Sequence, residues 1–513
     1  MMSKQKKKLI LLLGIFAVLL ALYFAVIVPL VESGQLPLDT DPPDTVDGEV
    51  IGVGDRYMIY PQVERENIRS LKVENEHGSY EFYTDKNGTF QIRGHEGVAY
   101  DQTKFANLVT SVGYPLAKVK VVDNATDKEL EEFGLLTPRA YWTLTTTAGK
   151  TYRVAVGYDL LTGGGYYVML DGRRSVYVLD DTLEDGVLAS VEYMTSCILV
   201  TGLSQESYLS VDNFTVRRNG DILVKINQVP ESERVNDQAL LENIISYPEG
   251  YYPNEELYYN VLFSYVEYTG ESVLYLDPTS EEYLACGLPD MHAENAEPPA
   301  YQVSFDVAGE PIILYFSEKQ PDNTYNVVSS LFPEKIVSVS ADSCEYLEKD
   351  LLAWLARYPF QQWIITVSAM EIRGAGADVK FTLTHGKDAA GNGTLEVHAS
   401  TGKFIPNEDV LNFRQFFRTL LSVKIEDYVP MTADEIAALT ADEANCLLSF
   451  TITNLQGEDT EYKFYPYSGS GRRALMTVNG HGEFYVLTDL IEKIASDANK
   501  VLAGLDVNSY AKD

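Results

Sequence analysis

Histidine and cysteine, the side chains that most often bind metals, are few and scattered in this chain. The six histidines include no HExxH or His-x-His motif, and the four cysteines include no CxxC pair and no cysteine–histidine pair with metal-ligand spacing. His385 and His398 are expected to face each other across a hairpin that turns near residues 391–393. No further ligand is placed beside them, so we predict no metal site and no cofactor.

The cysteines, Cys197, Cys286, Cys344 and Cys446, lie far apart in the sequence. We expect them to be separate thiols in the core. A Cys286–Cys344 disulfide is the alternative, because an exported chain can form disulfides.

Motifs of nucleophilic and phosphate chemistry are also missing. There is no G-x-S-x-G elbow, the S-x-x-K match at residues 400–403 lacks its partner motifs, and Gly163–Gly165 is not followed by Lys-Ser/Thr and a helix. The 75 acidic residues offer many carboxylate pairs, but general acid–base catalysis needs a pair held in one cleft. We predict no catalytic residue and a protein that is not an enzyme; a hydrolase with an unrecognised site is the alternative.

The N-terminus has the pattern of a membrane anchor. Residues 9–31 form an apolar run without a charged side chain, and as a helix they would reach about 34 Å, enough to cross a hydrocarbon core of about 30 Å. Four lysines stand in the preceding tail, residues 1–8, which predicts that this tail is cytoplasmic and the rest extracytoplasmic. A cleaved signal peptide would have a shorter apolar core. We therefore expect a single-pass protein of the plasma (inner) membrane.

The composition is that of a folded, acidic chain. Hydrophobic residues make up 45% and the formal charge is −35, which argues against nucleic acid and other polyanionic partners. We interpret the acidity as keeping the chain soluble. The alternative is that it attracts cations at the cell surface. The 35 tyrosines suit either sheet packing or a carbohydrate or protein contact surface.

An extended linker is expected at residues 32–60. This stretch is rich in proline and aspartate, which favours an open chain. Its aspartates lack the regular spacing and the distal glutamate of a calcium loop, so calcium binding is only a weak alternative.

Beyond the linker, three units of about 150 residues are predicted at 61–205, 206–360 and 361–513, the last being divergent. A capped amphipathic helix marks each unit, at residues 98–112, 235–245 and 405–421. A short helix follows, at 130–138, 282–289 and, less clearly, 441–448. Each unit opens with a strand (68–73, 210–216 and 363–367) and closes with two hairpins, the first unit's at 141–156 and 165–179. Antiparallel strands with one or two helices on one face predict an α+β fold class.

The short helix of the first unit carries a recognisable motif, Leu-x-x-aromatic-Gly-Leu-x-x-Pro, made by Leu130, Phe133, Gly134, Leu135 and Pro138. With the strand pair after it and the segments GGYYV and SVYVL, it resembles a bacterial envelope family of unknown function. Members of that family carry an N-terminal anchor and are often encoded beside gliding-motility-type ABC transporter components.

The resemblance is good over residues 66–200, weaker over 206–360, where Cys286 replaces the aromatic residue and Pro289 comes two positions early, and marginal over 361–513, where the glycine is absent. It provides no catalytic residue, and the five motif residues are interpreted as structural. It implies a non-enzymatic accessory or scaffold protein of an envelope ABC transport system, with permease or auxiliary subunits as partners. The alternative is an extracytoplasmic binding module for cell-wall glycan or peptide, suggested by the pairs Tyr166-Tyr167, Tyr251-Tyr252 and Tyr258-Tyr259.

Overall fold

The computed structural model describes residues 45–46, 48–231, 234, 242–467 and 471–508. The tail and the membrane span predicted at 1–8 and 9–31 lie outside these residues, as do residues 32–44 and 47 of the predicted linker. Within the part that is described, no helix is both long and apolar enough to cross a membrane.

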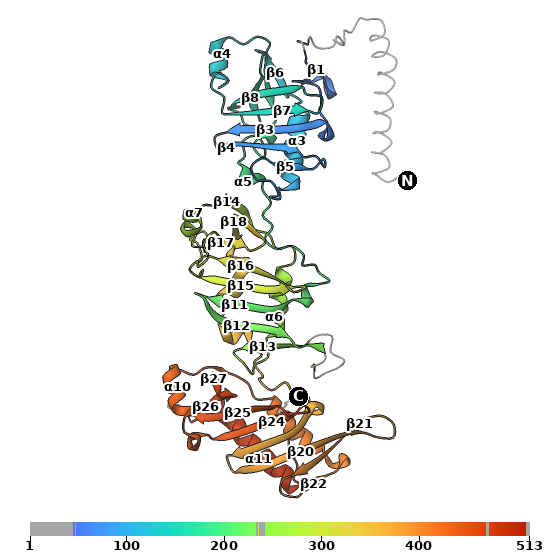
Figure 1. The fold of residues 1–513 in the computed structure, drawn as a ribbon, viewed down its shortest axis with the longest axis vertical. Coiled ribbons are helices and arrows are strands. Elements are labelled where there is room, and N and C mark those ends of the chain that lie inside the picture. The colour runs from blue at the N-terminus through green and yellow to red at the C-terminus, as the bar shows by residue number, and fades with distance from the viewer. Residues whose placement is uncertain (1–44, 47, 232–233, 235–241, 468–470, 509–513) are drawn as a thin grey trace, which may run out of the picture. The chain divides into compact units, whose positions relative to one another are not determined.

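The chain divides into two compact units between Thr195 and Ser196. The first unit contains one sheet of eight strands, and the second contains a sheet of eight and a sheet of nine strands. Every strand pairing in the three sheets is antiparallel, and short helices accompany each sheet (Figure 1). The predicted α+β class is therefore confirmed.

The three sheets share one strand order. The first runs β5 (Phe90–Ile92), β4 (Gly78–Thr84), β3 (Ile68–Asn75), β7 (Ala140–Thr146), β8 (Thr151–Asp159), β9 (Tyr166–Leu170), β10 (Val176–Leu179), β6 (Val119–Val122). The second runs β13 (Asn243–Tyr247), β12 (Asp221–Gln228), β11 (Asp212–Arg218), β15 (Tyr301–Val307), β16 (Glu310–Phe316), β17 (Thr324–Ser329), β18 (Phe332–Ser340), β14 (Ser272–Leu276). The third runs β22 (Phe404–Ile405), β21 (Gly393–Ala399), β20 (Ala377–Lys387), β19 (Val367–Gly374), β24 (Leu448–Asn454), β25 (Asp459–Pro466), β26 (Arg473–Val478), β27 (His481–Leu487), β23 (Asp427–Tyr428). Only β22 has no counterpart in the other two sheets.

A longer helix follows the opening strands of each sheet: α3 (Gln102–Gly113), α6 (Glu255–Ser264) and α9 (Leu411–Leu421). The first lies where it was predicted, and the Asp101 side chain accepts hydrogen bonds from the first-turn amides as an N-cap. The helix predicted at 235–245 is wrong over its described end, because residues 243–247 form strand β13 with Asn243 and Ile245 buried on one face. Its place is taken by α6, capped by Asn254. α9 was predicted, but no side chain caps it.

Short helices open with the same capping box in all three sheets: α4 (Asp127–Glu132), α7 (Ser280–Ala285) and α10 (Ala433–Thr440). The capping threonines stand at positions 126, 279 and 432, each paired with a glutamate three residues later. The third short helix was predicted at 441–448, which is wrong: that segment is a 3-10 turn leading into β24. The Thr-x-x-Glu pattern, which does not need the glycine, was the better signal.

Helices cover both faces of each sheet, not one face as predicted. Successive strand residues point to opposite faces, and on β8 the residues Val154 and Val156 belong to the core under α3, whereas Ala155 belongs to the smaller core under α4. The second and third sheets have the same two-sided arrangement.

The end of the segment predicted as a linker, 32–60, takes part in the first unit. Strands β1 (Val50–Ile51) and β2 (Tyr57–Met58) pair with each other, and Ile59 and Tyr60 are fully buried. The Trp142 indole donates a hydrogen bond to the Tyr60 hydroxyl at 2.9 Å. The correction follows from the apolar residues at 57–60, which outweigh the proline and aspartate signal that precedes them.

In the second unit, one continuous core joins both sheets. The segment between the sheets contains α8 (Leu351–Trp354) and binds to each of them by main-chain hydrogen bonds, Asn254 N to Trp354 O at 2.7 Å and Ile425 N to Arg357 O at 2.8 Å. The remaining α-helices are α5 (Val191–Met194) and α11 (Thr488–Ala503).

Candidate functional site

The motif residues of the first unit lie around the end of α4. Leu130 and Leu135 are buried in the small core with Ala155 and Val176, and Phe133 packs on Tyr167 with ring centroids 4.6 Å apart. Gly134 has φ +71, and the Leu135 amide donates to the Leu130 carbonyl at 2.7 Å, which ends the helix. Pro138 lies outside this core, in the loop before β7.

Replacing Gly134 with alanine is expected to lower the free energy of unfolding by about 1–2 kcal/mol, because an alanine at positive φ is strained. A Cβ there would also lie 2.8 Å from the Tyr158 ring, which must move. Gly149→Ala is the matched control, since Gly149 has φ +83 but open space around it. Gly134→Ala should speed hydrogen exchange at α4, and Gly149→Ala should speed it at the β7–β8 turn. The first increase should be the larger. Increases of equal size would contradict the contact with Tyr158.

The histidines and cysteines do not come together. The predicted hairpin of β20 and β21 is present, but His398 pairs with Thr382 and His385 with Leu395, so the two histidines do not face each other. His385 contacts the Val367 carbonyl at 2.7 Å and His398 stacks on Phe404. All four cysteines are free, so the alternative of a Cys286–Cys344 disulfide is wrong in this structure. Across the described residues there is no cluster of three or more metal-binding side chains.

The paired tyrosines mostly serve the core. Tyr166, Tyr251 and Tyr258 are buried, each with an exposed fraction of 5% or less. Tyr258 packs edge-on against Phe214. These pairs therefore do not form one aromatic surface.

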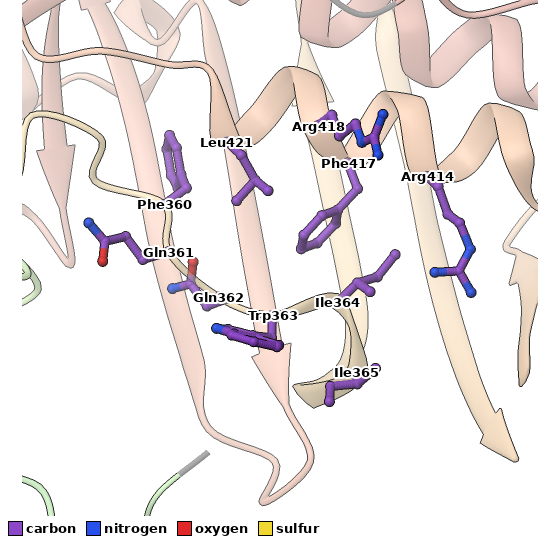
Figure 2. Close-up of a pocket in the computed structure, with 10 residues that line it drawn as sticks. All are labelled: Phe360, Gln361, Gln362, Trp363, Ile364, Ile365, Arg414, Phe417, Arg418 and Leu421. Atoms are coloured by element: carbon purple, nitrogen blue, oxygen red, sulfur yellow. The ribbon is translucent and has the colours of Figure 1, made fainter. Parts of the chain in front are cut away.

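The most distinctive surface feature is a groove of about 430 Å³ in the third sheet's part of the second unit. It lies between the segment Phe360–Ile365 and one face of α9 (Figure 2). Figure 2 shows Phe417 and Leu421 of α9 pointing toward that segment. Trp363 and Ile365 remain 58% and 55% exposed, although both are large apolar side chains.

The segment is held in place from both of its ends. Phe360 is buried between Phe450 and Tyr462, with ring centroids 4.7 and 4.2 Å away. At the other end, the Thr366 amide and hydroxyl donate to the Trp363 carbonyl at 2.9 and 2.7 Å, closing a 3-10 turn over residues 364–366. The prediction of a strand at 363–367 is therefore wrong up to Val367, and the turn leaves Trp363 and Ile365 at the surface.

The helix opposite is fixed by its inner face. Phe413 and Phe416 pack on Phe381 of β20 at 5.2 and 5.9 Å. The Thr419 hydroxyl donates to Asp497, a fully buried carboxylate on α11 that also pairs with Lys493 at 2.6 Å. The groove side of the helix carries residues spaced as on one helical stripe, namely Arg414, Phe417, Arg418 and Leu421. Of these, Phe417 is buried and Arg418 is exposed.

The charge of the groove is opposite to that of the chain. Its lining includes two arginines and no acidic residue, in a chain of formal charge −35. Neither the Arg414 nor the Arg418 guanidinium has a hydrogen bond or an ion pair to any residue of the described ranges. The Gln362 side-chain oxygen is buried and lacks a donor within the same ranges. The groove therefore offers apolar area, two free cations and one unused acceptor.

Such an arrangement suits the binding of a partner rather than the making or breaking of covalent bonds. Tryptophan and arginine are the residues that most often dominate protein–protein binding energy, and a guanidinium matches a carboxylate by two parallel hydrogen bonds. Sequence reasoning missed this groove, although two arginines four residues apart in an otherwise uncharged helix, in so acidic a chain, were a usable signal. Comparisons of the chain with protein-family models, with curated proteins and with solved structures find no match.

Proposed function

We propose that this chain is a membrane-anchored, extracytoplasmic contact protein that docks a partner polypeptide in the groove between residues 360–365 and α9. The partner segment carries an apolar anchor beside one or more carboxylates. The single observation that carries the proposal is that the exposed Trp363 lines the same groove as Arg414 and Arg418, which have no ion-pair partner among the described residues.

The groove is complementary to such a segment both in apolar character and in charge. Burying Trp363 and Ile365 removes apolar area from water, at roughly 25 cal/mol per Å². The two arginines are spaced by one helical turn, so one carboxylate-bearing segment can reach both. The acidic remainder of the chain repels an acidic polypeptide, which confines its binding to the groove.

The cellular setting of the proposal rests on sequence. The apolar run at 9–31 supports an anchor, and the motif at 130–138 supports a link to an envelope ABC transport system through its family resemblance. On this proposal, the docked segment belongs to a permease or auxiliary subunit of that system, and the three sheets act as a scaffold that carries the groove.

Selection from a phage-displayed library of random peptides against the full chain in a nonionic detergent tests the docking chemistry. Enriched peptides are expected to combine an aromatic or large aliphatic residue with Asp, Glu or a free C-terminal carboxylate. Trp363→Ala should weaken their binding at least ten-fold, and Arg414→Glu combined with Arg418→Glu should abolish it, because the charge reversal repels the carboxylate. Fluorescence polarisation of the labelled peptide measures both effects.

Leu505→Ala and Arg373→Glu are matched controls, since both residues are exposed and lie outside the groove lining. They should bind the peptide like the unaltered chain. Peptides that lack acidic groups, or equal binding by the double arginine variant, would overturn the proposal. Photo-crosslinking from position 365 in native membranes then identifies the partner segment, which must carry the same two features.

A further inference from the structure

A second pocket, of about 650 Å³, lies within the second compact unit and is separate from the groove. Its walls come from Tyr247 at the end of β13 and Tyr251 after it, from Tyr428 on β23, from Ile436 on α10, and from Glu483 and Phe484 on β27. Ligand-binding pockets in proteins commonly have volumes between about 300 and 1,000 Å³. None of these residues lines the groove described above.

Four aromatic residues, Tyr247, Tyr251, Tyr428 and Phe484, form one part of the pocket lining. Phe484 contacts Tyr428 and Tyr251, with centroid distances of 5.0 and 5.7 Å. Tyr428 is fixed by the Leu352 amide, which donates to its hydroxyl at 3.0 Å. Tyr247 is 50% exposed at the rim. The Tyr251 hydroxyl is buried and has no hydrogen-bond partner among the residues described, although a buried polar group normally has one.

One carboxylate stands in this aromatic setting. Glu483 has no ion pair or hydrogen bond to its side chain from any described residue. Partial burial raises the pKa of its carboxyl, and after burial its charge is the next cause that raises the pKa of Tyr251. Glu483 and Tyr251 both line the pocket. His481 is the other titratable side chain of the lining that lies on β27, and no lysine or arginine of the described ranges lines the pocket.

We infer that this pocket binds an organic ammonium group, held against the faces of the tyrosine rings and neutralised by the Glu483 carboxylate. Aromatic rings attract cations through their negative faces, most strongly when the cation is desolvated. A carboxylate without a partner supplies the opposite charge that a partly buried cation requires. The site is independent of the groove and of the docking proposal.

The chemistry favours an organic cation over the other ligand classes. A metal ion would need several oxygen or nitrogen ligands, and the described part of the chain has no such cluster here. An anion would be repelled by Glu483, with no basic side chain in the lining to offset it. Glu483 is exposed to water, and an uncharged ligand that displaced this water would leave the carboxylate without a partner, which is unfavourable.

Isothermal titration of the full chain with choline chloride tests the inference. We expect saturable one-to-one binding, and at least ten-fold weaker binding of 3,3-dimethylbutan-1-ol, the uncharged carbon analogue of choline. Glu483→Gln and Tyr247→Ala should each weaken choline binding at least ten-fold. Both residues are partly exposed, so the variants are expected to fold.

Glu408→Gln is the control, because Glu408 is exposed and lies outside the pocket while the change in net charge is the same. It should bind choline like the unaltered chain. Equal binding of choline and its uncharged analogue would overturn the inference, as would unaltered affinity in Glu483→Gln or the absence of saturable heat up to 20 mM choline. Trp363→Ala should leave choline binding intact, which separates this site from the groove.

Discussion

Raising the pH above 10 is expected to unfold the second compact unit, residues 196–513, before the first. The cause is the burial of tyrosine hydroxyls. Burial raises the pKa of nine almost fully buried tyrosines in the second unit, namely Tyr251, Tyr258, Tyr265, Tyr268, Tyr283, Tyr325, Tyr346, Tyr462 and Tyr465. In the first unit four tyrosines are buried to about this extent with a raised pKa, namely Tyr60, Tyr80, Tyr166 and Tyr177.

The sign follows from proton linkage. In the unfolded chain these hydroxyls ionise with a pKa near 10, whereas in the folded chain they stay protonated at higher pH. Above pH 10 the folded state therefore binds more protons, and its stability falls as the pH rises. Each such tyrosine contributes about 1.4 kcal/mol per pH unit, so the nine of the second unit contribute about 13 kcal/mol per pH unit and the four of the first about 6 kcal/mol. Since domains are stable by about 5–15 kcal/mol, one to two pH units are enough.

Absorbance at 295 nm, which follows phenolate formation, measures the effect alongside far-ultraviolet circular dichroism. The exposed tyrosines should titrate near pH 10, and a second, steeper rise should coincide with the loss of circular dichroism. Limited proteolysis should then cut residues 196–513 first. The chain in 6 M guanidinium chloride is the control and should show one transition near pH 10. A single such transition in the native chain, with circular dichroism unchanged, would contradict the burial of these hydroxyls.

Much of the fold was predictable because local pattern and final structure agree. Alternating residues around the turns at 148–149 and 171–172 predicted the hairpins β7–β8 and β9–β10, and both are present. The capped helix at 98–112 formed for the same reason. The failures occurred where one pattern fits two structures: a segment such as Asn243–Tyr247, with adjacent aliphatic residues, satisfies either helical or strand periodicity until tertiary packing decides.

The candidate sites were less predictable because they depend on long-range contacts. Trp363 is exposed only because Phe360 and Thr366 anchor a turn against strands nearly one hundred residues away in the chain. Glu483 on β27 shares a pocket with Tyr428 of the paired strand β23 and with Tyr247 and Tyr251, which are more than two hundred residues away in the chain. A single sequence gives the residue types at these positions, but not which of them share a surface.

Replacing Trp354 with alanine is expected to destabilise the second unit by about 3–5 kcal/mol, the usual loss for a buried aromatic side chain. Trp354 is fully buried on α8, with Phe214 of β11 at 5.7 Å and Tyr346 at 6.4 Å. Its main-chain carbonyl accepts a hydrogen bond from the amide of Asn254, the N-cap residue of α6. The second and third sheets were predicted as separate units, at 206–360 and 361–513. Because one core spans both, the variant should lower the unfolding temperature of both together.

Hydrogen exchange with mass spectrometry distinguishes the two possibilities. Amides of β19 and β24 in the third sheet should lose protection in Trp354→Ala together with those of β11 in the second, while β3 and β7 of the first unit should not change. Trp354→Phe is the matched control: it keeps an aromatic ring and removes a buried indole N–H that has no acceptor among the described residues, so its loss should be less than half as large. Loss of protection in the second sheet alone would mean that residues 206–360 and 361–513 unfold independently. The joint loss expected here means that the groove on α9 and the pocket beside Glu483 are held by a core that reaches across both sheets, so a substitution in the second sheet alters binding in the third.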